Sequence, residues 1–325
     1  MRAGRALALV GLTALASGCA STATFPEDGS VVPDASSPPD APPAPDAYVN
    51  PCAPFGAPAI SGKVLAPNGE DPVAGAVIYV PRQVDAFDPG VHCSPCLLPS
   101  AVLTRTSSAA DGTFLLPRVP PGPVQLVLQK GHFRRVLDLE LTCGQLLLLS
   151  TQQATLPGRS GAFAPLDSAP NIAVITGVWD DLAKVLLKLG IEQITAYDGD
   201  ERGGLPSLTQ LLEHPSTLAR YHWLLINCGN AFEHLLTETP TVVTNLRTYV
   251  ERGGRVFVTD LAYDFVEQAF PAAIDFQGSP ATAAESPEDP DLAEVGSDGL
   301  LVAAEVMDAQ LAQWLALPEI AALSP

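Results

Sequence analysis

Two folded units are predicted, an all-β sandwich followed by an α/β domain with a doubly wound parallel sheet. The first prediction comes from residues 59–157, where short apolar segments are separated by turn residues at intervals of about ten. The second comes from residues 171–325, where apolar segments alternate with helical patterns. With 325 residues, 47% of them apolar, the chain is long enough to bury a core in each unit.

Residues 1–19 have the pattern of a secretory signal. Arg2 and Arg5 precede a short apolar segment, residues 6–16, which is too short to span a bilayer as a permanent helix. The segment ends in Ala16-Ser-Gly-Cys19, which resembles the lipobox of bacterial lipoproteins, although leucine is commoner where Ala16 stands. The resemblance implies an exported lipoprotein of the outer membrane or cell surface, held in the membrane through acylated Cys19. The alternative is an ordinary signal peptide, cleaved without acylation.

Residues 20–58 are predicted to form a disordered tether. They consist mainly of Pro, Ala, Asp and Ser, and the chain as a whole contains 32 prolines. Such a segment has too few large apolar side chains to offset the entropy of folding, and its prolines favour an extended backbone. We expect it to hold the folded units away from the membrane surface.

The charge of the chain excludes one class of partner. Its formal net charge is −19, and it has no basic stripe. A protein of this charge is repelled by phosphate backbones, so we expect no nucleic-acid binding.

Four cysteines belong to the first unit and its approach, namely Cys52, Cys93, Cys96 and Cys143. In an exported protein four cysteines are expected to form two disulfides, and three pairings are possible. A zinc site or a redox motif at Cys93-Ser-Pro-Cys96 is the alternative, but the sequence lacks a second C-x-x-C or a histidine pair to complete a zinc site.

The first unit is expected to have six strands, and the glycine of Asp111-Gly112 predicts a hairpin between the third and the fourth. The predicted strands span residues 60–66, 76–80, 101–107, 113–116, 124–129 and 135–142.

Four motifs in this unit resemble the carboxypeptidase regulatory-like domain. They are Ile60-Ser-Gly-Lys-Val-Leu65, Pro72-Val-Ala-Gly-Ala-Val-Ile-Tyr-Val80, Ala110-Asp-Gly-Thr-Phe114 and Val119-Pro-Pro-Gly122. The resemblance implies a transthyretin-type Greek-key sandwich, which is also grouped with starch-binding-like folds. It implies a spacer or adhesion role, or carbohydrate binding as in some relatives. The unit has no tryptophan to stack on a sugar.

A linker, residues 158–170, is predicted to lead into the α/β domain. Four strands and four helices are predicted there. The strands span residues 172–176, 193–197, 223–227 and 255–259, and the helices residues 179–189, 207–213, 239–252 and 305–315. In parallel sheets ligands bind beyond the carboxyl ends of the strands. The candidate ligand-binding residues at these ends are Gly177, Asp198, Asn227, Gly229, Asn230 and Asp260.

The order of strand, Asn227-Cys-Gly-Asn230, long helix, Gly253-Gly254 and strand resembles the class I glutamine amidotransferase-like domain, a flavodoxin-like fold. In active members a cysteine stands at the turn after the fourth strand, and a later histidine is its base. Here Asp260 occupies that turn, Thr259-Asp-Leu-Ala262 lacks the glycines of a tight elbow, and all five histidines precede it. The resemblance therefore implies a degenerate domain. The two domains on an acylated tether resemble a family of myxobacterial-type lipoproteins.

Two residues remain candidates for catalysis. Cys228 is either a small core residue or a nucleophile paired with His234. Asp260 is either a nucleophile or general base, or part of a solvated acidic rim. It could also bind a cation together with Asp180, Asp181, Asp198, Asp200 and Asp264. The sequence contains none of the common nucleotide-binding or metalloprotease motifs, and we expect neither a cofactor nor a metal site.

The sequence thus favours a non-enzymatic cell-envelope lipoprotein that presents a binding or structural surface on a flexible tether. The alternatives are a carbohydrate- or peptidoglycan-binding protein, and a hydrolase or amidotransferase-like enzyme that uses Asp260 or Cys228. A carbohydrate or an envelope protein is the expected partner beside the membrane.

Overall fold

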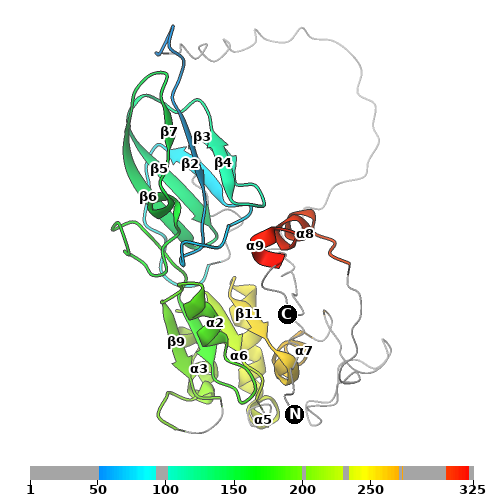
Figure 1. Ribbon diagram of the computed structural model, residues 1–325. Helices are drawn as coiled ribbons and strands as arrows, with labels where there is room; N and C mark the ends of the chain where they lie inside the picture. The colour runs from blue at the N-terminus through cyan, green and yellow to red at the C-terminus, as the bar shows by residue number, and fades with distance from the viewer. Residues whose placement is uncertain are drawn as a thin grey trace, which may run out of the picture.

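The computed structural model describes residues 51–92, 102–199, 203–229, 234–270, 273 and 305–321. A β-rich unit is followed by an α/β unit (Figure 1), which confirms the coarse architecture predicted from the sequence. The signal segment with Cys19, the tether up to residue 50, Cys93, Cys96, Asp200 and Asn230 lie outside the described residues.

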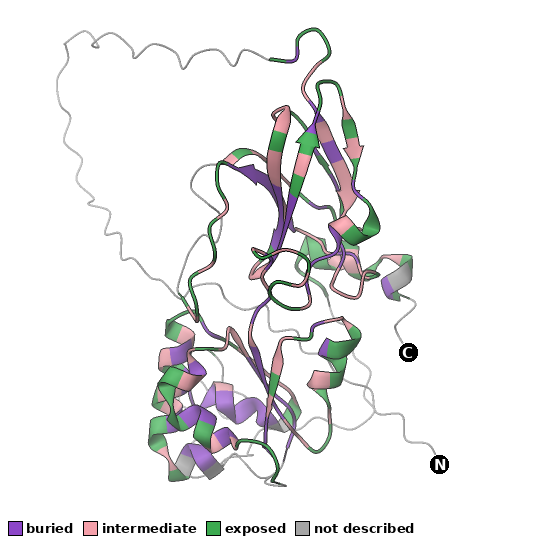
Figure 2. Ribbon diagram, turned by 90° about the vertical axis from the view of Figure 1, so that its left-hand side faces the viewer, coloured by how far each residue is buried: buried purple, intermediate pink, exposed green. Residues whose placement is uncertain are grey.

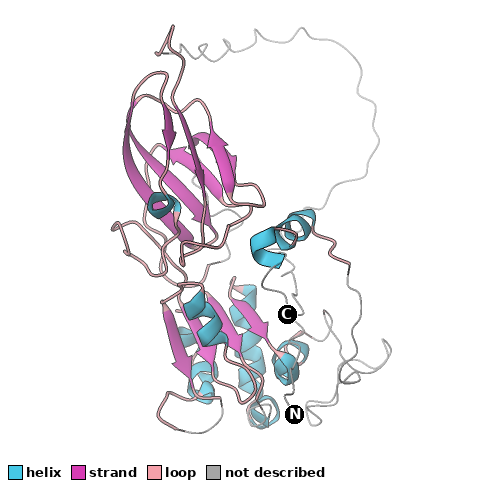
Figure 3. Ribbon diagram, viewed as in Figure 1, coloured by secondary structure: helices cyan, strands magenta, loops and turns pink. Residues whose placement is uncertain are grey.

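Seven strands in two sheets form the β-rich unit (Figure 3), arranged in the orders β4-β1-β7 and β3-β2-β5-β6. The strands are β1 (Ala59–Lys63), β2 (Val77–Pro81), β3 (Val102–Ser107), β4 (Thr113–Leu116), β5 (Gly122–Lys130), β6 (Phe133–Leu141) and β7 (Leu146–Leu148). The two sheets share one core, because alternate residues of their strands point between them. Ile60 and Leu116 come from the smaller sheet, Ile78 and Leu126 from the larger one, and all four are fully buried.

The predicted hairpin at Asp111-Gly112 is wrong. β3 and β4 belong to different sheets, so this turn carries the chain from one sheet to the other. The turn itself was recognised correctly, since Gly112 has φ +80° and a side chain there would lie 2.5 Å from the Val64 carbonyl oxygen. A turn signal fixes the local backbone, whereas the partner of each strand depends on distant residues.

β7 and a short helix, α1 (Thr151–Ala154), were not predicted. β7 pairs in parallel with β1, placing Leu147 opposite Ile60. Its continuous leucines give no period-2 signal, and Leu146 and Leu148 stay exposed on the outer face. Ser150 starts α1 as an N-cap in a capping box with Gln153.

A disulfide between Cys52 and Cys143 closes the β-rich unit. Cys52 is only 1% exposed, so the fold includes the last residues of the predicted tether. The prediction of disulfides is confirmed for this pair.

The α/β unit contains a four-stranded parallel sheet in the order β11-β10-β8-β9. The strands are β8 (Ile172–Ile175), β9 (Ile194–Tyr197), β10 (Trp223–Ile226) and β11 (Arg255–Val258). The helices are α2 (Leu182–Lys188), α3 (Leu208–Glu213), α4 (Pro215–Leu218), α5 (His234–Glu238), α6 (Pro240–Glu251), the 3₁₀ helix η1 (Asp260–Tyr263) and α7 (Asp264–Glu267).

Both faces of the parallel sheet are covered (Figure 2), as the continuous apolar strands predicted. Ala173 and Ile175 of β8 pack with helices α3 to α7, whereas Ile172 and Val174 pack with α2 and with Phe133 of the β-rich unit. The helix predicted from residue 179 starts only at Leu182, where Asp181 caps it. Leu182, Leu186 and Leu189 pack against the sheet, whereas Val185 lies to the side of this stripe and is exposed.

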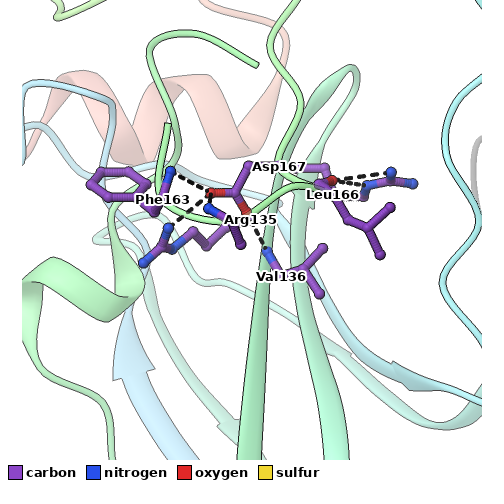
Figure 4. Close-up of polar contacts among 7 residues, drawn as sticks. Arg135, Val136, Phe163, Leu166 and Asp167 are labelled. Atoms are coloured by element: carbon purple, nitrogen blue, oxygen red, sulfur yellow. Dashed lines mark hydrogen bonds and ion pairs between the residues drawn. The ribbon is translucent and has the colours of Figure 1, made fainter. Parts of the chain in front are cut away.

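Residues 158–170 are a packed segment that contacts both units. The Glu192 N–H donates to the Gly158 carbonyl oxygen at 2.9 Å, and Arg134 and Ser168 form a two-way backbone bridge. The carboxylate of Asp167, whose side chain is completely buried, accepts from Arg135 Nη1 at 2.9 Å and from the Val136 N–H at 2.9 Å (Figure 4).

Two further helices, α8 (Ala309–Leu315) and α9 (Pro318–Ala321), lie beside the β-rich unit (Figure 1). The indole N–H of Trp314 donates to the Pro72 carbonyl oxygen at 2.9 Å, which ties this segment to the β1–β2 loop. None of the described helices is both long and apolar enough to cross a membrane.

Candidate functional site at the carboxyl edge of the parallel sheet

The structure brings the predicted ligand-binding residues to one edge of the parallel sheet, because they follow the carboxyl ends of parallel strands. Gly177 follows β8, Asp198 follows β9, Asn227 and Gly229 follow β10, and Asp260 follows β11. Only Asn230 lies outside the described residues.

The centre of this edge, between β8 and β10, is closed by the chain itself. A side chain at Gly177 would collide with the Cys228 carbonyl oxygen. The same oxygen accepts the N–H of Val178 at 2.9 Å. Residues 177–181 therefore lie directly against the end of β10.

The carboxylate of Asp180 is hydrogen-bonded to the end of β10. Its Oδ1 accepts the N–H of Cys228 at 2.9 Å, and Thr259 Oγ1 accepts the same N–H at 2.9 Å. The N–H of Cys228 is therefore satisfied by side chains of the protein itself.

Asn227 fixes the same segment. Its Oδ1 accepts the N–H of Leu182 at 2.9 Å, and its Nδ2 donates to the Ile175 carbonyl oxygen at 2.7 Å. The amide is buried, so its hydrogen bonds are worth more than they would be in water. The polar groups of Asn227 hold α2 onto β10.

Asp260 forms a tight corner without any glycine, which corrects the expectation that a tight turn needs one there. Its φ is +47°, in the left-handed region that few residues other than glycine adopt. Aspartate tolerates this conformation better than most residues. The side chain is exposed at the start of η1.

The predicted gathering of carboxylates around Asp260 does not form. Asp264 is fully buried below the corner, and Asp181 caps α2 by accepting the Lys184 N–H at 3.0 Å. Asp198 Oδ2 accepts the N–H of Gly203 at 2.6 Å. Within the described ranges no cluster of His, Cys, Asp or Glu is suited to hold a metal ion.

Cys228 is 2% exposed, as expected for a core cysteine. Three of the histidines, His92, His132 and His222, gather at the opposite edge of the sheet, since His222 directly precedes β10. Six residues of extended chain separate His222 from Cys228, a distance of about 20 Å. These three histidines are too far away to act as a base for Cys228.

A second site, which the sequence did not reveal, is a slot of about 410 Å³ in the β-rich unit. β2 and β5 pair only between residues 77–79 and 127–129, and beyond these residues the strands separate. Pro81, which has no N–H to donate, lies where they part. The slot is lined by Val80, Pro81, Arg82, Leu103, Pro123, Val124, Gln125, Asp138 and Leu139.

The rim of this slot carries polar groups of different kinds. Gln125 Nε2 donates to Asp138 Oδ1 at 3.0 Å, and Arg82 supplies a guanidinium. Val124 and Leu139 add apolar side chains to the lining. Of the two candidate sites, the sheet edge is closed by the chain between β8 and β10, and the slot is open.

Comparisons with models of known protein families, with curated proteins and with solved structures find no match to this chain.

Proposed function

We propose that this protein is a non-enzymatic cell-envelope lipoprotein, which presents a binding surface at the end of a tether anchored through acylated Cys19. The observation that carries this proposal is the hydrogen bond from the Cys228 N–H to the Asp180 carboxylate. In the amidotransferase-like resemblance the loop after β10 would hold an oxyanion or a substrate, and in this chain the Asp180 carboxylate accepts the backbone N–H of that loop. A substrate oxyanion would have to displace a charged, hydrogen-bonded side chain.

The histidine positions support the same proposal. Acyl-transfer chemistry needs a base within hydrogen-bond reach of the nucleophile. His132 and His222 lie at the opposite edge of the sheet from Asp260. His234, the partner predicted for Cys228, begins α5, and its side chain lies outside the described residues. We infer that the α/β unit is a degenerate amidotransferase-like domain that serves as a scaffold.

We also propose a specific fold for each of the two units. A central β8 flanked by β9 and β10 is the strand order of a flavodoxin-like domain, and it supports that assignment for the α/β unit. The chain passes from one sheet to the other after β1, β3, β4 and β6, and these crossings support a transthyretin-type Greek-key sandwich of the carboxypeptidase regulatory-like kind.

Palmitate labelling in a bacterial host tests the anchor. The full chain is expected to incorporate the label and to fractionate with membranes, whereas Cys19→Ser loses both properties. Cys228→Ser serves as the control and should keep both. Labelling that persists in Cys19→Ser would contradict the proposed anchor.

The open slot favours a second candidate function, which is binding of a carbohydrate or peptidoglycan fragment. Its amide, carboxylate and guanidinium suit hydroxyl and amide groups, and its volume accommodates a small ligand. The absence of tryptophan from the lining weakens stacking on a sugar ring.

A thermal-shift titration with soluble muropeptides and neutral oligosaccharides tests this second function. A true slot ligand should raise the melting temperature of the wild type and have no effect on Gln125→Ala or Asp138→Ala. Glu140→Gln, an exposed change on the same strand outside the slot lining, is the matched control. An equal shift in all four proteins would place the ligand elsewhere.

One observation favours the enzymatic alternative, namely the strained corner at Asp260, because left-handed non-glycine residues are frequent at active sites. Hydrolase and amidotransferase assays should show no turnover that Asp260→Asn or Cys228→Ser removes. Loss of a measurable activity in either variant would replace the non-enzymatic proposal.

A further inference from the structure

The two folded units meet at a stacked pair of histidines. His132 lies at the tip of the β5–β6 hairpin, and His222 directly precedes β10 of the parallel sheet. Their ring centroids are 4.1 Å apart with the planes tilted by 44°. Phe87, from the loop after β2, packs edge-on against the other side of His132 at 5.5 Å.

The same loop makes a second contact with the α/β unit. The N–H of Val91 donates to the Ala219 carbonyl oxygen at 3.0 Å, and Val91 packs against the core of the α/β unit. His92 follows it in the sequence. The interface thus combines a hairpin tip and a loop from one unit with the amino edge of the parallel sheet in the other.

The hydrogen bonds of His222 require a neutral ring. The N–H of Asn171 donates to His222 Nδ1 at 2.9 Å, so this nitrogen carries no proton. The ring also hydrogen-bonds the backbone of Gly90, in the loop of the β-rich unit. A protonated imidazole has no acceptor and cannot keep the bond from Asn171.

The charged groups around the pair all disfavour protonation. Burial, followed by the neighbouring His222, Arg255 and His92, lowers the pKa of His132 to about 4. Burial and His92 lower the pKa of His222, and the backbone bond to Gly90 only partly opposes this. Among the described residues no carboxylate acts on either ring.

A further charge at this interface belongs to Arg134, whose guanidinium lies 3.9 Å from the centre of the Phe87 ring. The carboxylates near it, Asp85 and Asp167, act on Arg134 itself. They therefore do not compensate a positive charge on the histidine pair.

We propose that the histidine pair is an acid-sensitive latch between the two units: at neutral pH it holds the hairpin tip and the loop around Gly90 against the amino edge of the parallel sheet, and acid releases them. Protonation of both rings would place two positive charges about 4 Å apart, beside Arg255, and would remove the bond from Asn171.

The direction of the effect follows from the two protonation states. Separated histidines bind protons below about pH 6.5, whereas the pKa of docked His132 is lowered to about 4 and that of docked His222 is lowered as well. The docked arrangement is therefore fully stable above pH 6.5 and loses stability as the pH falls from 6.5 towards 4.

Amide hydrogen exchange of the full chain at pH 7.5 and pH 4.5, corrected for intrinsic rates, tests the latch. Residues 87–91 and the amide of Asn171 are expected to lose protection at least tenfold at pH 4.5, whereas the centre of β10 stays protected. The double variant His132→Phe, His222→Asn keeps a ring and an acceptor but cannot titrate there. It should stay protected at both pH values.

His214→Asn is the matched control, because His214 hydrogen-bonds the Gln210 carbonyl oxygen on its own helix. In this variant residues 87–91 and the amide of Asn171 should lose protection at pH 4.5 as they do in the wild type. Unchanged protection of the wild type at pH 4.5, or equal opening in the double variant, overturns the proposal. If the double variant does not fold, an NMR titration of wild-type His132 tests the latch instead. A titration midpoint near pH 6.5 without chemical-shift changes at Val91 overturns the proposal. A midpoint near or below pH 5, accompanied by chemical-shift changes at Val91, supports it.

Discussion

At Asp260 the chain turns from β11 into η1. The backbone there has a left-handed conformation, which is unfavourable for most residues. The positive φ of 47° lets the corner form without the glycine that the sequence lacked. Aspartate fits because its short polar side chain tolerates the left-handed region.

The effect of a substitution at this corner on the free energy of unfolding should depend on how well the new residue tolerates the left-handed backbone. Asp260→Gly is expected to leave the free energy of unfolding unchanged or to raise it slightly, whereas Asp260→Val should lower it by about 2 kcal/mol. Urea unfolding measures both. The same pair of changes at Arg118, which has φ +54°, is the control for strain without a candidate site. Equal stability of Asp260→Gly and Asp260→Val would contradict the strained corner.

Asp180 makes a second residue-level prediction. Asp180→Ala removes a charged acceptor of the Cys228 N–H, and the exchange of this amide should accelerate about tenfold. Asp181→Asn is the matched control, since it keeps a capping group on α2 and does not contact Cys228. Exchange rates that stay equal in the two variants would show that Asp180 does not close the edge.

At the scale of elements, the segment between the units is held mainly by Asp167. Its carboxylate accepts from Arg135, from Val136 and from the N–H groups of Phe163 and Ala164 (Figure 4). The sequence predicted only a linker here, because the four hydrogen bonds to the Asp167 carboxylate leave no recognisable pattern in the neighbouring residues.

Loss of this carboxylate should be costly. Asp167→Ala is expected to lower the free energy of unfolding by about 3–5 kcal/mol, since it leaves a buried guanidinium without its partner. The exposed pair Arg159–Glu192, 3.5 Å apart in the same segment, is the control, and Glu192→Ala should cost under about 1 kcal/mol. Denaturant unfolding compares the two. Similar losses would mean that Asp167 does not anchor the segment.

At the scale of the whole molecule, two glycines let the units approach. A side chain at Gly158 would collide with the Gly190 carbonyl oxygen, and one at Gly190 would lie 2.6 Å from the backbone of Asn68. Gly190 also ends α2 with φ +75°, as its position after the helix predicted. Its second role, at the junction, depends on the tertiary structure.

Gly158→Ala should therefore weaken the contact between the units. We expect a lower melting temperature and faster exchange of the Glu192 amide, which donates to Gly158. Gly161→Ala is the control, because it adds backbone strain in open space. A smaller effect of Gly158→Ala than of Gly161→Ala would contradict the close approach.

The disulfide also acts at this scale. Cys52 and Cys143 are 91 residues apart, and closing so long a loop stabilises the β-rich unit by up to about 4 kcal/mol. Reduction should lower the melting temperature of the wild type but not that of Cys52→Ser. Peptide mapping without reduction checks the pairing directly, and Cys52 linked to Cys93 or Cys96 would contradict it.

The sequence by itself determined where the β-rich and α/β units lie, which strands are buried on both faces, and which residues end them. These features depend on local periodicity, capping residues and turn residues, all of which can be recognised within short stretches of sequence. Gly177, Asn227 and Asp260 could therefore be assigned to one edge of the sheet in advance.

Only the tertiary structure decided which sheet each strand joins, that Asp180 accepts the Cys228 N–H, and that His132 meets His222. Each of these contacts joins residues distant in the sequence, and the two histidines are 90 positions apart. Such contacts depend on how the chain closes its loops and packs its cores, and no local pattern encodes them.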